Sequence, residues 1–225
     1  INALGLKITY NPSIILHTNN FYLANNNGLK IAHNQIEKEL ESIIKTNFNK
    51  LEMTRVDFAK NIETKLYCHE YNEFFRAISG KRMKSNEYLE GYMFKNKSRQ
   101  IVFYDKIREL KEKQKIDVKN DIFKEKNILR SELRLMKKKV IENNIGFNVI
   151  ENFYSKENYN HCKQVYKNII SDVVFKKKTD EKQLTFAFND EIEKIKYYKN
   201  NYKRNSIDKY LAHINISNIL KIYGN

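Results

Sequence analysis

Three short segments of this chain alternate between two sets of side chains with a period of two, which restricts each segment to a β-strand. The segments are residues 54–58, 101–106 and 128–136. One set is apolar and comprises Val56 and Phe58, Ile101 and Phe103, and Leu129, Leu133 and Leu135. The other set comprises Arg55 and Asp57, Val102, Tyr104 and Lys106, and Arg130, Glu132 and Arg134. Each strand therefore has one face suited to packing under helices and one face that carries ionisable groups.

In the remaining pattern, the expected strands cluster before residue 140, and only helices are expected after it. We therefore predict an α+β fold in which helices cover one face of a central antiparallel β-sheet, followed by a helical C-terminal part. We expect two domains, residues 1–140 and 141–225, with a boundary near residues 140–148. The expected strands are 6–10, 14–23, 29–32, 51–59, 87–94, 99–106 and 128–136. The expected helices are 34–46, 69–79, 105–115, 150–175, 189–203 and 206–222.

Asparagine and glycine suggest the local structure near the N-terminus. The run Asn25-Asn26-Asn27-Gly28 lies between two apolar stretches. Asn-Gly supplies the positive φ angles of a tight turn, so this run predicts a β-hairpin. Asn34 and Glu37 are spaced as a capping box, which predicts the start of a helix there.

Positive charge is concentrated in one part of the chain. The 225 residues carry a net charge of +15, and residues 81–140 hold 19 basic against 9 acidic residues, a net charge of +10. Such a concentration is typical of a protein that binds a polyanion, and nucleic acid is favoured over an anionic membrane because no basic amphipathic helix stands out. A lysine-rich surface that only promotes solubility is the alternative. No apolar run approaches the roughly 20 residues that span a bilayer, so we expect a soluble protein.

The two cysteines, Cys68 and Cys162, are too far apart in sequence to form a CxxC pair. This spacing argues against a disulfide scaffold and against a thiolate zinc site. We expect unreactive thiols in a reducing compartment.

The ionisable faces of the three strands combine three kinds of chemistry. The carboxylates of Asp57 and Glu132 are hard oxygen ligands of the kind that Mg²⁺ or Mn²⁺ prefers. Arginine and lysine side chains bind phosphate oxygens, and a tyrosine such as Tyr104, beside cations, can act as a nucleophile. These are the components of phosphodiester transesterification. The alternative is a solvated sheet face without function.

In order and spacing, three motifs in residues 5–140 resemble the replication initiators of filamentous phages, the gene II type, and the related initiators of rolling-circle plasmids. The first is Thr54-Arg55-Val56-Asp57-Phe58-Ala59, and the second is Ser98-Arg99, followed by Val102-Phe103-Tyr104-Asp105-Lys106 and Glu109. The third is Leu129-Arg130-Ser131-Glu132-Leu133-Arg134. The resemblance implies a nicking and joining enzyme with a sheet similar to that of the HUH endonucleases.

The resemblance also implies roles for individual residues. Tyr104 would be the nucleophile, Lys106 would contact the scissile phosphate or assist the leaving oxygen, and Asp57 and Glu132 would hold Mg²⁺ or Mn²⁺. The implied DNA-binding residues are Arg55, Arg99, Arg130 and Arg134. The chain has no His-hydrophobic-His triplet, which fits the gene II branch and leaves Glu63 and His69 as candidates for a third ligand. Tyr88 and Tyr92 are rival nucleophiles, expected on one face of the preceding strand.

These implications define the expected activity. The enzyme would nick one strand of origin DNA, keep the 5′ phosphate on tyrosine and rejoin the strand without ATP. Single-stranded or hairpin DNA is the expected substrate, because its bases are then open to aromatic side chains. Host helicase and polymerase are the expected partners, in the cytoplasm of a bacterial host. The alternatives are a non-catalytic single-stranded nucleic-acid-binding protein and a metal-dependent nuclease that uses water.

Overall fold

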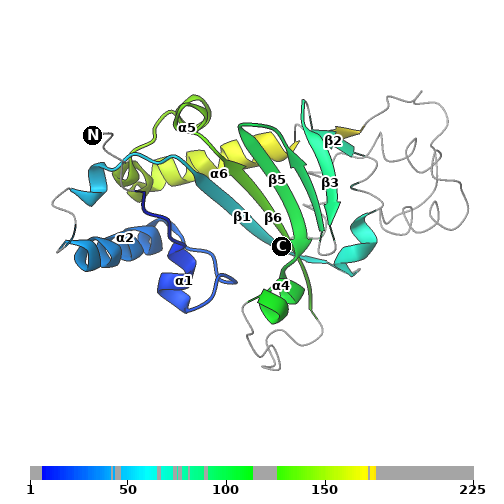
Figure 1. Cartoon of the computed structure of the whole chain (residues 1–225), viewed down its shortest axis with the longest axis horizontal. Coiled ribbons are helices and arrows are strands. Elements are labelled where there is room, and N and C mark those ends of the chain that lie inside the picture. The colour runs from blue at the N-terminus through cyan, green and yellow to red at the C-terminus, as the bar shows by residue number, and fades with distance from the viewer. Residues whose placement is uncertain are drawn as a thin grey trace, which may run out of the picture.

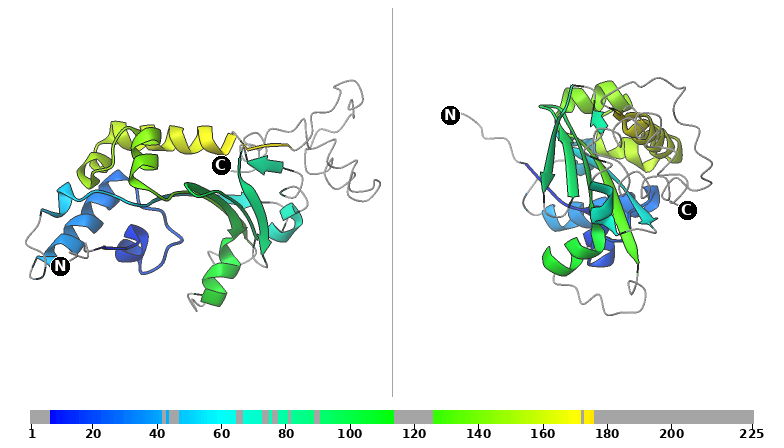
Figure 2. Two further views of the ribbon diagram at one scale, coloured as in Figure 1. Left: turned by 45° about the horizontal axis from the view of Figure 1, so that its top comes forward. Right: turned by 90° about the vertical axis from the view of Figure 1, so that its right-hand side faces the viewer.

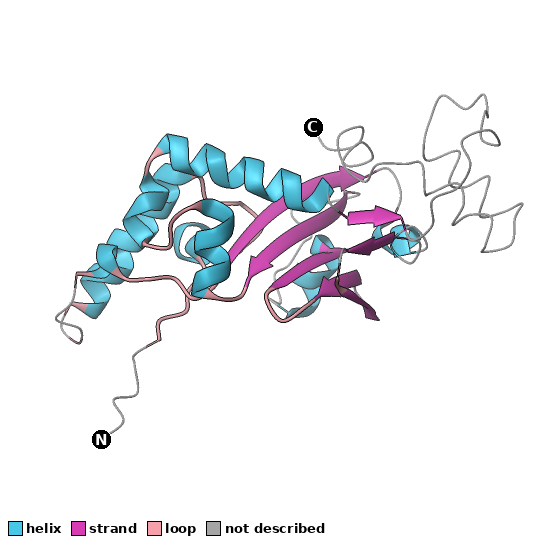
Figure 3. Ribbon diagram, turned by 90° about the horizontal axis from the view of Figure 1, so that it is seen from above, coloured by secondary structure: helices cyan, strands magenta, loops and turns pink. Residues whose placement is uncertain are grey.

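A computed structural model describes residues 7–175, except residues 42, 44–46, 65–66, 73–74, 76–77, 81, 89–90, 114–125 and 172. Its α-helices are α1 (Pro12–His17), α2 (Asn26–Leu40), α4 (Lys106–Lys113), α5 (Lys138–Ile145) and α6 (Lys156–Ser171). Three short 3-10 helices are η1 (Phe48–Lys50), η2 (Cys68–Tyr71) and η3 (Ile150–Tyr154). Most of this helical structure gathers at one end of the molecule (Figure 3).

The centre of the molecule is a five-stranded antiparallel sheet with the order β1-β6-β5-β4-β3 (Figure 1). Its strands are β1 (Val56–Thr64), β3 (Lys84–Tyr88), β4 (Gly91–Lys95), β5 (Arg99–Asp105) and β6 (Asn127–Leu135). A second sheet pairs β2 (Ile78–Gly80) with β7 (Val173–Phe175). The predicted α+β fold with a central antiparallel sheet is confirmed.

The main hydrophobic core lies between one face of this sheet and the helices α5 and α6. The sheet contributes Ile62, Phe94, Ile101, Phe103, Leu129, Leu133 and Leu135, and the two helices contribute Ile141, Ile145, Cys162, Val165, Ile169 and Ile170. Every one of these side chains is buried, and the sheet residues among them include the apolar sets predicted for β5 and β6. Helices therefore cover one face of the sheet, as expected.

Two shorter helices lie on the other side of the sheet. Figure 2 shows a strongly curved sheet with α6 above it and α1 and α4 below it. Ile107 and Leu110 of α4 form a small second core with Ile128 of β6, and Phe21, from the segment after α1, packs against it. The face that carries the ionisable groups is thus bordered at one end by α4 and by the segment after α1.

The predicted N-terminal hairpin is wrong, because asparagine caps a helix as readily as it forms a turn. The side chain of Asn25 accepts a hydrogen bond from the Gly28 backbone N–H at 2.8 Å, and Asn25 thereby caps the start of α2. Asn11 and Pro12 begin α1 in the same way, and α1 occupies the first part of the strand expected over 14–23. The predicted helix therefore starts at Asn26 rather than at Asn34, and its capping box does not form.

Several other predicted boundaries differ from the structure, and for β2 the pairing partner is distant in sequence. The segment predicted as a helix over 69–79 does contain η2 and helical residues at Asn72 and Phe75, but it ends in β2, which pairs with β7 almost 100 residues later. The strand predicted over 51–59 begins only at Val56, and the strand predicted over 87–94 is two strands, β3 and β4. The helix predicted over 150–175 is η3, α6 and β7, and α5 was not foreseen.

The helices predicted over 189–203 and 206–222 lie outside the described residues. The division into domains 1–140 and 141–225 stays a prediction. Both α5 and α6 pack in the same core as the sheet. Within the described part of the chain, no helix has the length and apolar character needed to cross a membrane.

A partly buried polar cluster around His33 joins α2 to the 3-10 helices η1 and η3. The Nδ1 atom of His33 lies 3.0 Å from the Tyr154 hydroxyl, which donates to Asn49 Oδ1 at 2.5 Å. The His33 ring also makes edge contacts with Tyr10 and Phe48. Burial lowers the pKa of His33 to about 4, because the charged imidazolium loses its hydration there.

We expect this histidine to make the fold sensitive to acid. The pKa of His33 is lower in the folded chain than in the unfolded chain. Its contribution to the free energy of unfolding is therefore complete above about pH 6.5 and is lost as the pH falls towards 4. The free energy of unfolding should fall by about 3 kcal/mol through this group. Denaturant titrations at pH 7 and pH 4 should show a smaller loss in His33→Gln than in the wild type. The exposed His161 supplies the control, since His161→Gln should keep the full loss.

Candidate active site

Strand register brings the polar side chains of β1, β5 and β6 onto one face of the sheet, opposite the main core. Residues paired across antiparallel strands lie on the same face. Tyr104 of β5 is paired with Arg130 of β6, and Arg130 is paired with Asn61 of β1. Two residues along, Val102, Glu132 and Ala59 form the next row, and Gln100, Arg134 and Asp57 form the third. We call this surface the polar face.

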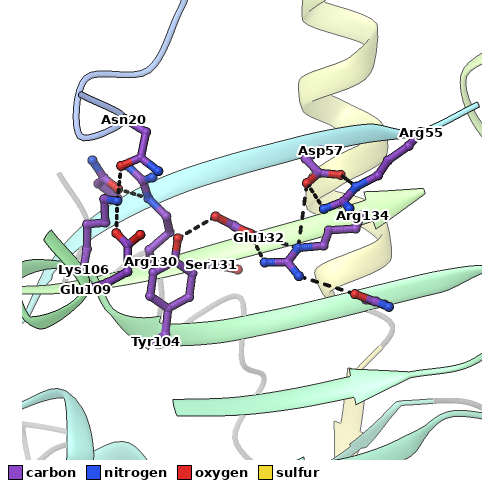
Figure 4. Close-up of polar contacts among 12 residues, drawn as sticks. Asn20, Arg55, Asp57, Tyr104, Lys106, Glu109, Arg130, Ser131, Glu132 and Arg134 are labelled. Carbon is purple, nitrogen blue, oxygen red and sulfur yellow. Dashed lines mark hydrogen bonds and ion pairs between the residues drawn. The ribbon is translucent and has the colours of Figure 1, made fainter. Parts of the chain in front are cut away.

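Tyr104 and Glu132 form the central contact of the polar face (Figure 4). The Tyr104 hydroxyl donates to Glu132 Oε1 at 2.6 Å, and the Tyr104 side chain is only 8% exposed. Burial and the negative charge of Glu132 raise the pKa of the Tyr104 phenol, although the positive charge of Arg130 opposes them. The phenol is therefore protonated in this state, and its proton points at a carboxylate.

Glu132 is ionised although it is poorly exposed. Burial by itself would raise its pKa, but the hydrogen bond from Tyr104 and the charges of Arg134 and Arg130 lower the pKa below its usual value. Arg134 donates to Glu132 Oε2 through Nε at 3.0 Å and Nη2 at 2.7 Å. Two charge-assisted hydrogen bonds from one guanidinium hold this carboxylate in position.

Asp57 lies next to this pair, at the outer end of the same network. Its Oδ2 is 3.8 Å from Arg134 Nε and 2.6 Å from Arg55 Nη2. The guanidinium of Arg134 therefore contacts both predicted metal ligands, and its Nη1 donates to Gln100 Oε1 at 3.4 Å. Figure 4 shows Arg134 between the two carboxylates.

Lys106 is a fully buried cation at the start of α4. Its side chain is 0% exposed and donates to Glu109 and to the side-chain carbonyl of Asn20. Burial and the repulsion from Arg130 lower the pKa of Lys106 to about 8, while Glu109 opposes that shift. A lysine with this pKa can release or accept a proton near neutral pH.

Arg130 is held from the opposite side by the segment that follows α1. Its Nε donates to Asn61 Oδ1 at 2.7 Å, and its Nη2 donates to the Phe21 carbonyl at 3.0 Å. Asn61 also donates to the Phe21 carbonyl, at 2.8 Å. These bonds leave Arg130 only 2% exposed, directly across the strand from Tyr104.

The structure separates some of the other predicted site residues from this cluster. Arg55 contacts Asp57 just before β1, but Arg99 pairs with Leu135, on the face that carries the core. Glu63 is six residues from Asp57 along β1, about 20 Å, and pairs with Lys126. His69 lies in η2, where it stacks on Tyr67, and its neighbours Cys68 and Tyr71 are in the main core. Neither Glu63 nor His69 is placed to share a metal with Asp57.

The two rival tyrosines lie on opposite faces of the sheet, and the prediction that they share one face is wrong. Tyr92 is 5% exposed and packs against Phe75 and Phe94 in the main core. Tyr88 is paired with Gly91, which is paired with Tyr104, so Tyr88 lies on the polar face. It is two strands from Tyr104, a distance of about 10 Å.

The expected metal ligands are present on one face but do not form an open metal centre. Asp57 and Glu132 are each bonded to an arginine, and both contact Arg134. Among the residues that the structure describes, no group of three His, Cys, Asp or Glu side chains could hold a metal ion.

Gly91 allows β4 to approach β5 closely beside Tyr104. A Cβ at this position would lie 1.9 Å from the Phe103 carbonyl oxygen and 2.7 Å from the Tyr104 Cα. Both contacts are with backbone atoms, which cannot move aside as a flexible side chain can. Glycine is therefore required at this position, because the backbone of β5, which carries Tyr104, lies so close.

We expect Gly91→Ala to displace β5 and lower the free energy of unfolding by about 1–3 kcal/mol. Urea denaturation measures this loss. Met93→Ala, two residues along β4 on the same face, is the control, since Met93 is only partly buried and its truncation leaves the approach of the two strands unchanged. Equal stability of Gly91→Ala and the wild type would contradict the close approach.

Sequence reasoning missed four residues of the site: Asn20, Asn61, Gln100 and Glu109, the last of which was quoted only as part of a motif. Asn20 and Asn61 lie 86 and 69 residues from the groups that they bind. The contact of Glu109 with Lys106 could have been predicted, because Glu109 lies one helical turn after Lys106 and residues three apart on a helix can form an ion pair.

The fold and the site together define a class: an α+β protein whose antiparallel sheet presents a tyrosine, a carboxylate and several cations on one face. Residues 5–157 match the family model for the N-terminal region of a phage replication-associated protein, the gene II product. This match spans well over half of the chain, so the protein belongs to that family, the gene II type of filamentous phages, as the sequence motifs indicated. Searches of curated proteins and of solved structures found no match. Family membership implies a replication initiator that binds DNA in rolling-circle replication.

Proposed function

We propose that this chain nicks and rejoins one strand of origin DNA through a covalent bond to Tyr104. The observation that carries the proposal is the hydrogen bond from the Tyr104 hydroxyl to Glu132, among Arg130, Arg134 and Lys106. A phenol beside a carboxylate can lose its proton as it attacks, and the cations can stabilise the charge on phosphate.

The Tyr104 oxygen attacks the scissile phosphorus and its proton passes to Glu132, while the bond from phosphorus to the 3′ oxygen breaks. The leaving 3′ oxygen takes a proton from Lys106, whose pKa of about 8 suits that transfer and whose ammonium must first be uncovered from Asn20 and Glu109. The 5′ phosphate stays on Tyr104, so the reverse step rejoins the strand without ATP.

A dependence on Mg²⁺ or Mn²⁺ stays a prediction of the sequence. Asp57 and Glu132 would hold the ion only after release from Arg55 and Arg134, and the ion would then supply further positive charge at the phosphate. Activity with and without a chelator, followed by addition of each ion, measures this dependence.

A covalent adduct is the direct test of the proposal. The protein is incubated with a pool of single-stranded oligonucleotides of randomised sequence, labelled at the 3′ end, with Mn²⁺ present. A labelled band that migrates with the protein on a denaturing gel supports the proposal, because the fragment 3′ of the nick keeps its phosphate on tyrosine. Sequencing the captured DNA would then identify the preferred site.

Two other outcomes would favour the alternative functions. Cleavage without an adduct would indicate a nuclease that uses water, and binding without cleavage would indicate a non-catalytic DNA-binding protein. We also propose that the protein acts in the cytoplasm of a bacterial host, together with host helicase and polymerase. The reason is that its family serves rolling-circle replication.

A further inference from the structure

A row of cations crosses the polar face at the end away from α4. The third row of the sheet continues from Arg134 and Gln100 to Lys95 of β4 and Lys84 of β3, which are paired in register. Both lysines are exposed and lie on the same face as Tyr104, because Lys95 is four residues from Gly91 on β4. We call Lys84, Lys95 and Arg134 the cationic row.

Lys84 and Lys95 lie opposite each other, and none of the described residues pairs with either charge. Like charges directly opposite each other across two strands destabilise a sheet. Asp57, at the far end of the row, is bonded to Arg55 and Arg134. Neither Lys84 nor Lys95 makes an ion pair with any described residue. An anion from outside the chain would remove this repulsion.

We propose that the cationic row binds the phosphates of single-stranded DNA as the strand leaves the Tyr104 site. This inference rests on the proposed function and extends it to a binding site outside the predicted residues. Negative charge on the ligand matches the row, and the regular phosphates of a DNA backbone match cations spaced along one line.

The dimensions of the sheet place this row beyond the attacked phosphate. Gln100 and Tyr104 are four residues apart on β5, so the row lies about 13 Å from the tyrosine along the strand. Adjacent strands are about 4.8 Å apart, so the row extends about 14 Å from β6 to β3. Between the row and Tyr104 lie Asn86, Met93 and Val102, which carry no charge, and Glu132, whose carboxylate is bonded to Tyr104 and Arg134.

The salt dependence of binding tests the row. Affinity for fluorescent oligo(dT) is measured over a range of salt concentrations, in a Tyr104→Phe background so that no DNA is cut. The slope of log K against log salt is negative, and loss of two phosphate contacts should reduce its magnitude by about 1.4 for single-stranded DNA. We expect this change in the double variant Lys84→Gln with Lys95→Gln.

The control is Lys139→Gln with Lys167→Gln, which removes the same charge from exposed lysines on α5 and α6. This control should keep the original slope, and an equal change in both double variants would overturn the proposal. An unchanged slope in the Lys84 and Lys95 variant would also overturn it, as would a change confined to duplex DNA. Thermal melting checks that both double variants fold.

Failure of this proposal can be distinguished from failure of the proposed function. An adduct with the wild type together with an unchanged slope would reject only the cationic row. A changed slope without any adduct would reject strand transfer and leave the row as a DNA-binding site.

Discussion

Tyr104→Phe is expected to abolish the covalent adduct with single-stranded DNA while leaving DNA binding almost unchanged. The variant removes one oxygen, the atom that donates to Glu132 and that we propose attacks the phosphate. The ring stays in its buried place and Glu132 keeps both bonds from Arg134, so the fold should lose only about 1–2 kcal/mol. The measurement is the labelled adduct on a denaturing gel, with affinity for the same DNA measured in parallel.

Two other tyrosines serve as matched controls for that experiment. Tyr88→Phe removes a hydroxyl from the same face of the sheet, and Tyr92→Phe removes one from the core face. Both should keep the adduct. An adduct that persists in Tyr104→Phe and disappears in Tyr88→Phe would reassign the nucleophile and keep the class of reaction. Cleavage that survives all three changes would show that water is the nucleophile.

Glu132→Gln is expected to produce the second largest effect, a fall in the rate of adduct formation on the order of 10²-fold or more. Glutamine keeps the shape of the side chain, but it cannot take the proton of Tyr104 and it no longer neutralises Arg134. Arg134 still lies near Asp57, so the chain should remain folded. Single-turnover rates at saturating DNA measure the effect, and circular dichroism confirms the fold.

Asp57→Asn tests whether Asp57 and Glu132 have different roles, with Glu132 as the proton acceptor, or act together as metal ligands. Asp57 contacts Arg134 and Arg55, whereas the Tyr104 hydroxyl donates to Glu132, so the loss of Asp57 should slow the reaction much less than the loss of Glu132. Equal losses in the two variants, with recovery of both at high Mn²⁺, would show instead that the carboxylates act together on a metal ion. That result would replace proton transfer to Glu132 with metal binding.

The faces of the three central strands were predictable because alternation depends only on the strand itself. Ile101 and Phe103 are in the core, and Tyr104 lies on the other face, as their order along the chain requires. The hairpin at residues 14–32 was wrong for the corresponding local reason, since Asn25 suits both a turn and a helix cap. Tertiary packing selected the cap.

From the order of the residues alone, the α+β class, the family, the concentration of positive charge and the polar face with its tyrosine could be predicted. Which carboxylate meets Tyr104, why Arg130 and Lys106 are buried, and which lysines extend the row depend on tertiary structure. The register of β1, β6, β5, β4 and β3 decides these neighbours. Periodicity assigns a side chain to a face, but its partner is set by pairing between distant segments, as with Asn20 and Lys106, which lie 86 residues apart.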